Sequence, residues 1–131
     1  MPRLTAASAV LAASALVLGG CGGDATFRTN RPILRLQVDE YRIVPQEVVV
    51  KPGRVKFVVR NAGRLTHNLV IEVPPKQPDG KPVLVSRTET MQPGQTAPPI
   101  KVTLAPGEYR LVCTIANHDD LGQFGTLKVQ R

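Results

Sequence analysis

The segment that decides the fold is residues 107–129, GEYRLVCTIANHDDLGQFGTLKV. Tyr109, Leu111 and Cys113 occupy every second position, which indicates a β-strand with one buried face. The run LKV at 127–129 alternates in the same way and predicts the last strand of the chain. The segment therefore predicts two strands joined by a loop, with the Cys113 thiol directed toward the apolar interior.

The loop between these strands carries side chains that suit a copper ion. Cys113 stands at the end of the first strand, His118 follows five positions later, and Gln123 follows after five more. Thiolate and imidazole are the strong ligands of trigonal copper sites that also have a weak axial ligand. A loop of this length can bring a strand-end cysteine and a loop histidine to one metal. A third strong ligand must then come from elsewhere in the chain.

The third ligand is predicted to be His67, because the chain has only two histidines. It lies 46 residues before Cys113, so that only the fold can bring the two together. Its ring shares the alternation of Leu69 and Ile71, which points it inward at the end of the sandwich. The alternative is that the two histidines are structural residues held by hydrogen bonds.

Residues 33–131 consist of short apolar runs separated by turn signals, which predicts an all-β, Greek-key antiparallel β-sandwich. Short strands are also predicted at Glu47–Val50 and Val83–Val85, the latter within the proline-rich region 74–99. No stretch has helical periodicity. The residues predicted to face inward are Leu34, Leu36, Val38, Val55, Phe57, Val59, Leu69, Ile71, Val73, Ile100, Val102 and Leu104.

The N-terminal residues 1–20 are typical of an export signal peptide, with one early positive charge followed by an apolar stretch. The tetrapeptide LGGC at 18–21 resembles a bacterial lipobox, so Cys21 is predicted to carry lipid and to become the mature N-terminus. The alternative is an ordinary cleaved signal with an incidental Cys21. Residues 21–32 are predicted to be a flexible tether. The prediction is an exported protein anchored to the outer face of the bacterial cytoplasmic membrane or in the periplasm.

The number of cysteines supports the prediction of a metal site at Cys113. Two cysteines in an exported protein would first suggest a disulfide. If Cys21 carries lipid, Cys113 is left as an odd thiol in an oxidising compartment. A metal explains such a thiol, because coordination deprotonates and protects it.

The charge and the aromatic content of the chain argue against one class of partner, nucleic acid. The net charge is +7, but the basic residues are scattered and aromatic residues make up only 4% of the chain. This composition argues against binding to nucleic acid. Arg28, Arg31 and Arg35 next to the anchor would either attract anionic headgroups or simply keep the tether solvated. A length of 131 residues predicts a short leader followed by a single domain, which comprises residues 33–131.

The sequence resembles the cupredoxins, the type 1 (blue) copper family of plastocyanin, azurin and auracyanin. The resemblance rests on HN at 67–68, PGEYRLVCT at 106–114, His118, and GQFGTLKV at 122–129. It covers almost the whole predicted mature chain. It implies that the two histidines and the cysteine hold one copper ion that cycles between Cu(I) and Cu(II).

The resemblance also implies roles for residues around these ligands. Most relatives have methionine where this chain has Gln123, but stellacyanin-like members use glutamine as the axial ligand. An amide oxygen is a harder donor than a thioether, so it should favour Cu(II) and lower the reduction potential. The alternative is that Gln123 only hydrogen-bonds the loop. Asn68 and Thr114 are implied to tie the ligand loops together, and the Thr66 carbonyl is implied on the opposite axial side.

Taken together, these features predict a membrane-tethered, monomeric one-electron carrier and not an enzyme, since no open metal position or acid–base pair is evident. Its partners would be transient redox proteins such as a cytochrome, docking near His118 with Ala116, Leu121 and Phe124 as apolar contacts. One alternative is copper storage, sensing or delivery at the cell surface. Another is a β-sandwich without metal, used for adhesion or as an accessory module.

Overall fold

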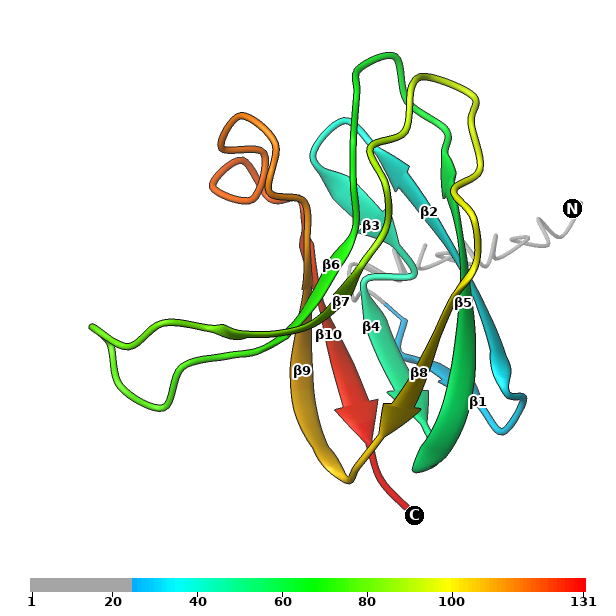
Figure 1. The fold of residues 1–131 in the computed structure, drawn as a ribbon, viewed down its shortest axis with the longest axis vertical. Coiled ribbons are helices and arrows are strands. Elements are labelled where there is room, and N and C mark those ends of the chain that lie inside the picture. Colours follow the sequence, from blue (N-terminus) through cyan, green and yellow to red (C-terminus); the bar gives the residue numbers. More distant parts are fainter. Residues whose placement is uncertain (1–24) are drawn as a thin grey trace, which may run out of the picture.

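The computed structural model describes residues 25–131 as two packed β-sheets (Figure 1). A six-stranded sheet has the order β1-β4-β10-β9-β6-β7, and a four-stranded sheet has the order β3-β2-β5-β8. The predicted β-sandwich is confirmed, and the described residues contain no helix. The strands are β1 (Phe27–Thr29), β2 (Ile33–Asp39), β3 (Arg42–Val44), β4 (Glu47–Val50), β5 (Gly53–Asn61), β6 (Val70–Val73), β7 (Val83–Arg87), β8 (Ile100–Leu104), β9 (Gly107–Val112) and β10 (Phe124–Val129).

The strand pairing is mixed and not purely antiparallel. β2 pairs with β5 in parallel, and β4 pairs in parallel with both β1 and β10. The other strand pairs are antiparallel. The mixture arises because the chain crosses between the two sheets, so that neighbours in a sheet are often not consecutive in the sequence.

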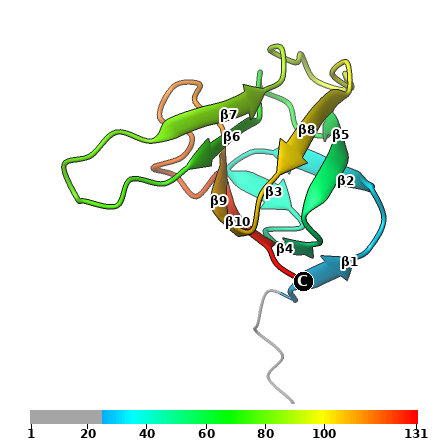
Figure 2. The same ribbon diagram turned by 60° about the horizontal axis from the view of Figure 1, so that its bottom comes forward.

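The core forms where the inward faces of the two sheets meet. Alternating residues of β2 and β5 are fully buried there, as the sequence predicts. The prediction that Val73 faces inward is wrong, because Val73 is the last residue of β6 and is exposed where the β6–β7 hairpin leaves the sandwich. Glu72 is also buried, and its carboxylate lies 3.5 Å from the Arg110 side chain of the neighbouring strand β9. The β6–β7 hairpin then projects away from the sandwich (Figure 2).

The structure corrects part of the predicted tether. Within residues 21–32, Phe27–Thr29 form β1 and pair with β4. Three residues are too few to show an alternating pattern, which is why the sequence gives no sign of this strand. The signal peptide and Cys21 lie outside the described residues. Among residues 25–131, no helix is long and apolar enough to span a membrane.

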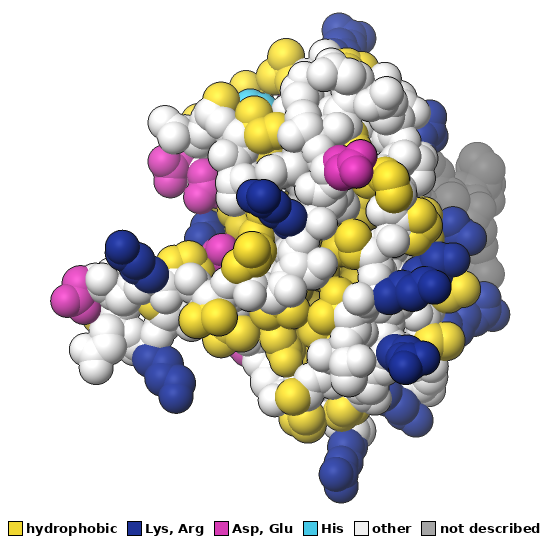
Figure 3. Space-filling view, viewed as in Figure 1, with side chains coloured by type: hydrophobic (Ala, Val, Ile, Leu, Met, Phe, Trp, Pro, Cys, Tyr) yellow, Lys and Arg dark blue, Asp and Glu magenta, His cyan; other side chains and the backbone are white. Residues whose placement is uncertain are grey.

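Charged side chains are unevenly distributed over the surface. In Figure 3, Lys and Arg gather along the right-hand side and the lower end, over β5 and β8. The Asp and Glu side chains that are visible lie in the upper half and on the β6–β7 hairpin. The upper end, where the loops after β2, β5 and β9 meet, is the end that carries the predicted ligands (Figure 1).

Candidate metal centre

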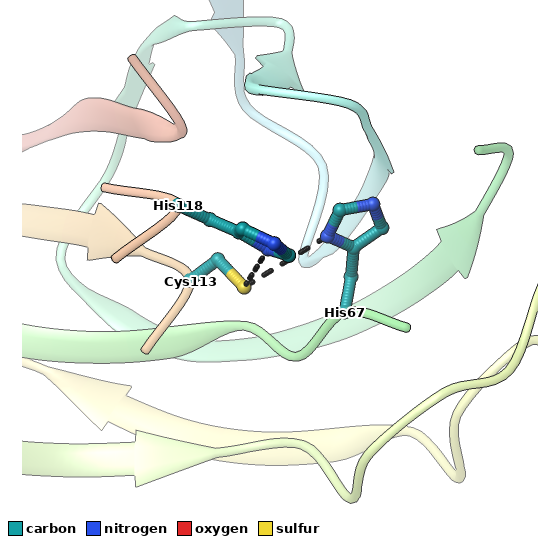
Figure 4. Close-up of side chains that lie close together, drawn as sticks. All are labelled: His67, Cys113 and His118. Carbon is teal, nitrogen blue, oxygen red and sulfur yellow. Dashed lines mark hydrogen bonds between the residues drawn. The ribbon is translucent and has the colours of Figure 1, made fainter. Parts of the chain in front are cut away.

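The fold brings His67, Cys113 and His118 together at one end of the sandwich (Figure 4). The Cys113 Sγ lies 3.9 Å from His67 Nδ1 and 3.7 Å from His118 Nδ1. The three candidate ligand atoms all lie within 4.8 Å of one another. Two ligand atoms at about 2.0–2.3 Å from a shared ion, separated by a trigonal angle, are about 3.8 Å apart. The observed spacing therefore fits one trigonal metal ion.

Each ligand is held by backbone hydrogen bonds around it. His67 lies between β5 and β6, and its backbone exchanges two hydrogen bonds with Met91, at 3.1 and 2.8 Å. Cys113 directly follows β9, and its N–H donates to the Gln123 carbonyl at 3.2 Å. In the loop between them, the Gln123 N–H donates to the His118 carbonyl at 3.0 Å. These bonds fix the ligands in place without help from a metal.

The predicted connection between the two ligand loops is present. The Asn68 Nδ2 donates to the Thr114 Oγ1 at 3.0 Å, and the Thr114 N–H donates to the Asn68 Oδ1 at 2.9 Å. This reciprocal pair joins the residue after His67 to the residue after Cys113. The Thr66 hydroxyl bonds the Gln92 side chain at 3.2 Å, and the axial role of the Thr66 carbonyl stays a prediction.

Gln123 is fully buried, and one end of its amide lacks a partner. Its Nε2 donates to the Asp39 carbonyl at 2.8 Å. Its Oε1 has no hydrogen-bond partner among the described residues. A buried, unsatisfied oxygen is costly, typically by about 1–3 kcal/mol. Coordination to an ion held by the thiolate and imidazoles would satisfy this oxygen, and the axial role of Gln123 stays a prediction.

The sequence analysis missed Glu40, which contacts the far side of His67. One Glu40 carboxylate oxygen accepts hydrogen bonds from the backbone N–H groups of Arg64 and Leu65, the latter at 2.9 Å. The same oxygen lies 3.7 Å from His67 Nε2, a buried nitrogen with no hydrogen-bond partner among the described residues. The two N–H donors hold the pKa of Glu40 below its usual range. No local pattern marks Glu40, because it reaches the site only through the fold.

The electrostatics favour a neutral His67. Burial lowers the pKa of its imidazole, and the nearby His118 lowers it further. Glu40 and the Gln123 side chain act in the opposite direction, but the pKa of His67 stays below its ordinary value. A histidine must be neutral at the nitrogen that binds a metal, so this environment prepares the ring for coordination.

His118 is the least buried of the three candidate ligand residues. The residue is only 7% exposed. Tyr41, in the turn between β2 and β3, packs edge-on against it with ring centroids 5.8 Å apart. Tyr41 itself is 39% exposed. Sequence analysis missed this residue. The predicted contacts Ala116, Leu121 and Phe124 are exposed, as expected.

The donor set fits copper on chemical grounds. A thiolate, two imidazoles and an amide oxygen match the trigonal sites with a weak axial ligand that copper occupies in electron-transfer proteins. Hard, oxygen-preferring cations such as Mg²⁺ and Ca²⁺ do not suit such ligands.

Solved structures share this fold. A dithionite-reduced auracyanin from Roseiflexus castenholzii is 20% identical, with a TM-score of 0.68 over 79% of this chain and 100% of that chain. Auracyanin A, a "blue" copper protein from Chloroflexus aurantiacus, is 17% identical, with a TM-score of 0.61 over 75% and 99% of the two chains. Reduced rusticyanin is 18% identical, with a TM-score of 0.63 over 86% and 88%. The sequence matches no protein-family model and no curated protein. The predicted cupredoxin fold is confirmed, and the His–Cys–His cluster lies where the sequence resemblance implied.

Proposed function

We propose that this protein is a type 1 copper protein that carries single electrons outside the cytoplasm, tethered to a membrane. The observation that carries the proposal is the spacing of the Cys113 sulfur and the two histidine Nδ1 atoms, which suits one trigonal ion. The fold supports it, since auracyanin A is described as a blue copper protein. The proposed role is electron transfer and requires no catalysis.

The mechanism depends on ligands that keep their positions. Copper, when bound, supplies the one-electron redox couple. Cys113 and His67 are tied to their neighbours by backbone hydrogen bonds, and the Asn68–Thr114 pair joins their loops. A site whose ligands cannot move far reorganises little when its charge changes by one. His118 is the least buried of the three candidate ligands and Tyr41 packs against it near the surface, so electrons are proposed to leave through this pair.

The cellular setting is part of the proposal. The predicted signal peptide and lipobox at Cys21 support export and lipid attachment. We expect transient redox proteins to dock at the His118 end, where Leu121 and Phe124 are exposed. Small apolar contacts without a dense network of ion pairs suit encounters that must end quickly.

The test is the visible and EPR spectrum of the protein after addition of Cu(II). The expected result is an intense visible thiolate-to-copper band together with reversible voltammetry. Replacing the ligand thiol, Cys113→Ser, should abolish the band, whereas Cys21→Ser should leave it unchanged. Tight copper binding without reversible voltammetry would instead support copper storage, sensing or delivery. A protein that binds no copper would contradict the proposal and leave a β-sandwich without metal.

A further inference from the structure

Two neighbouring hollows beside the start of β2 form one continuous surface. Both are lined by Pro32 and Ile33, so they meet at these residues. The first extends toward β1, and the second extends over the outer face of β5 and β8. We call their combined surface the basic face. Its cationic residues are Arg31, Arg35, Arg54, Lys56 and Lys101.

The basic face has positive charges and no acidic side chain to balance them. Neither hollow is lined by Asp or Glu. None of its five cations takes part in an ion pair within residues 25–131. Lys56 and Lys101 stand directly opposite each other on β5 and β8, an arrangement that destabilises a sheet. An anionic partner would relieve this repulsion.

Exposed apolar side chains lie among these charges. Phe27 is 46% exposed and Ile33 is 44% exposed, and both line the first hollow. Basic side chains surrounding a few exposed apolar ones are typical of surfaces that sit at the lipid–water interface. An acidic protein would be attracted by the charges but would give the two exposed apolar residues no comparable environment.

The length of the chain before β1 places this surface near a membrane. The predicted lipid attachment site Cys21 is six residues before Phe27, which is the first residue of β1. Six residues span at most about 20 Å. A domain held this closely must keep the surface around β1 close to the bilayer, and the basic face begins there.

The metal centre lies at the opposite end of β2. This strand starts with Ile33 on the basic face and ends with Asp39, whose carbonyl accepts the hydrogen bond from Gln123. Its seven residues span about 20 Å. A membrane bound at the basic face would therefore leave the metal end directed away from the lipid.

We propose that the basic face docks on an anionic phospholipid membrane and orients the domain with its metal centre toward the solvent. The proposal extends the membrane tethering in the proposed function to a specific surface of the protein. Its test uses neither copper nor a lipid anchor, so its failure and the failure of the copper proposal are separate results.

The test measures binding of the chain from residue 21 onward, carrying Cys21→Ser, to lipid vesicles. All ten strands of the described residues lie within this chain. The vesicles contain phosphatidylcholine alone or phosphatidylcholine with 30% phosphatidylglycerol. The variant Arg35→Gln/Lys56→Gln/Lys101→Gln should bind the anionic vesicles at least about tenfold more weakly, since each basic residue near such a surface contributes several-fold. Binding should also weaken with added salt.

The matched control removes the same charge elsewhere. Lys76→Gln/Lys81→Gln/Arg87→Gln changes three exposed residues of the β6–β7 hairpin region. This control should bind nearly as well as the parent chain. Equal weakening in both triple variants would mean that only total charge matters, and would overturn the proposal. Binding that does not depend on phosphatidylglycerol would overturn it as well.

A fluorescence measurement tests which surface touches the lipid. The chain has no tryptophan, so a single introduced one reports its own environment. The emission of Ile33→Trp should shift to shorter wavelength on anionic vesicles, and that of Val83→Trp on the hairpin should not. An unshifted Ile33→Trp emission would overturn the proposal. So would a chain that ignores the vesicles but binds polyglutamate through the basic face, because the partner would then be an acidic protein.

Discussion

At the scale of single residues, His67 presents its two ring nitrogens to two different partners. Its Nδ1 faces the Cys113 sulfur, and its Nε2 faces the Glu40 carboxylate. A carboxylate beside Nε2 favours the tautomer with the proton on that nitrogen, which leaves Nδ1 free to bind a metal. The same negative charge stabilises whichever oxidation state of the metal is more positive. In the proposed copper protein, Glu40 would therefore both orient the ring and favour the more positive oxidation state of the bound ion.

The variant Glu40→Gln tests this bias. It keeps an oxygen that can accept from the Arg64 and Leu65 N–H groups but removes the charge. We expect the ratio of the site's affinity for Cu(II) to its affinity for Cu(I) to fall about tenfold in this variant. Such a fall raises the reduction potential by about 59 mV. Voltammetry measures the potential. Glu108→Gln, at the start of β9 and the far end of the sandwich, is the control and should shift it much less. Equal shifts in both variants would contradict the role of Glu40.

Gln123 is tested by its replacement with methionine. If the unpartnered Oε1 is the axial donor, Gln123→Met exchanges a hard oxygen for a softer thioether and should raise the reduction potential. The visible spectrum should change in the same sample. Gln130→Met, on an exposed residue after β10, should leave both unchanged. An unaltered reduction potential and spectrum in Gln123→Met would show that the Gln123 side chain forms only hydrogen bonds within the protein and does not bind the metal.

The lowered pKa of His67 predicts how the metal-free protein responds to acid. The ordinary pKa is about 6.5, and the folded protein holds it lower, chiefly through burial and then through His118. The unfolded chain therefore binds the proton more readily than the folded one. The resulting stability is present above about pH 6.5 and is lost as the pH falls below it. Thermal unfolding of the metal-free protein between pH 7 and pH 5 measures the loss, and His67→Asn should show a smaller pH dependence.

At the scale of elements, strands with a two-residue alternation of buried and exposed side chains could be predicted from the sequence, and strands or turns without one could not. β5 and β9 follow the two-residue period over most of their length, so their buried faces and the inward Cys113 could be predicted. β1 and β3 have three residues each, too few to show a period. The turn between β2 and β3 brings Glu40 and Tyr41 to the site, and no spacing rule connects that turn to either histidine.

The link between the ligand loops gives a prediction at this scale. Asn68→Ala removes both hydrogen bonds to Thr114 and leaves the Thr114 N–H without this acceptor. We expect a loss of about 1–3 kcal/mol in the free energy of unfolding. Denaturant unfolding of the metal-free protein measures it. Asn30→Ala, on an exposed residue between β1 and β2, should change the stability by less than about 0.5 kcal/mol. A similar small change in Asn68→Ala would mean that the loops are held by other contacts.

At the scale of the whole molecule, the two ends of the sandwich carry different chemistry. The end with the candidate metal centre presents Tyr41, Leu121 and Phe124 near the buried histidine and cysteine side chains. The basic face begins at the other end of β2 (Figures 1 and 3). The proposed tethered electron carrier would need this separation, because a redox partner and a membrane cannot occupy the same surface.

Membrane binding should therefore leave the redox site accessible. We expect the copper-loaded chain to be reduced by hydroquinone, a small neutral reductant, at nearly the same rate free and bound to phosphatidylglycerol vesicles. A neutral reductant is neither attracted nor repelled by the anionic lipid, so that its rate reports access alone. Stopped-flow bleaching of the visible band measures the rate. The vesicle-bound rate would fall by tenfold or more if the metal end faced the lipid, and that result would reverse the orientation inferred from the basic face.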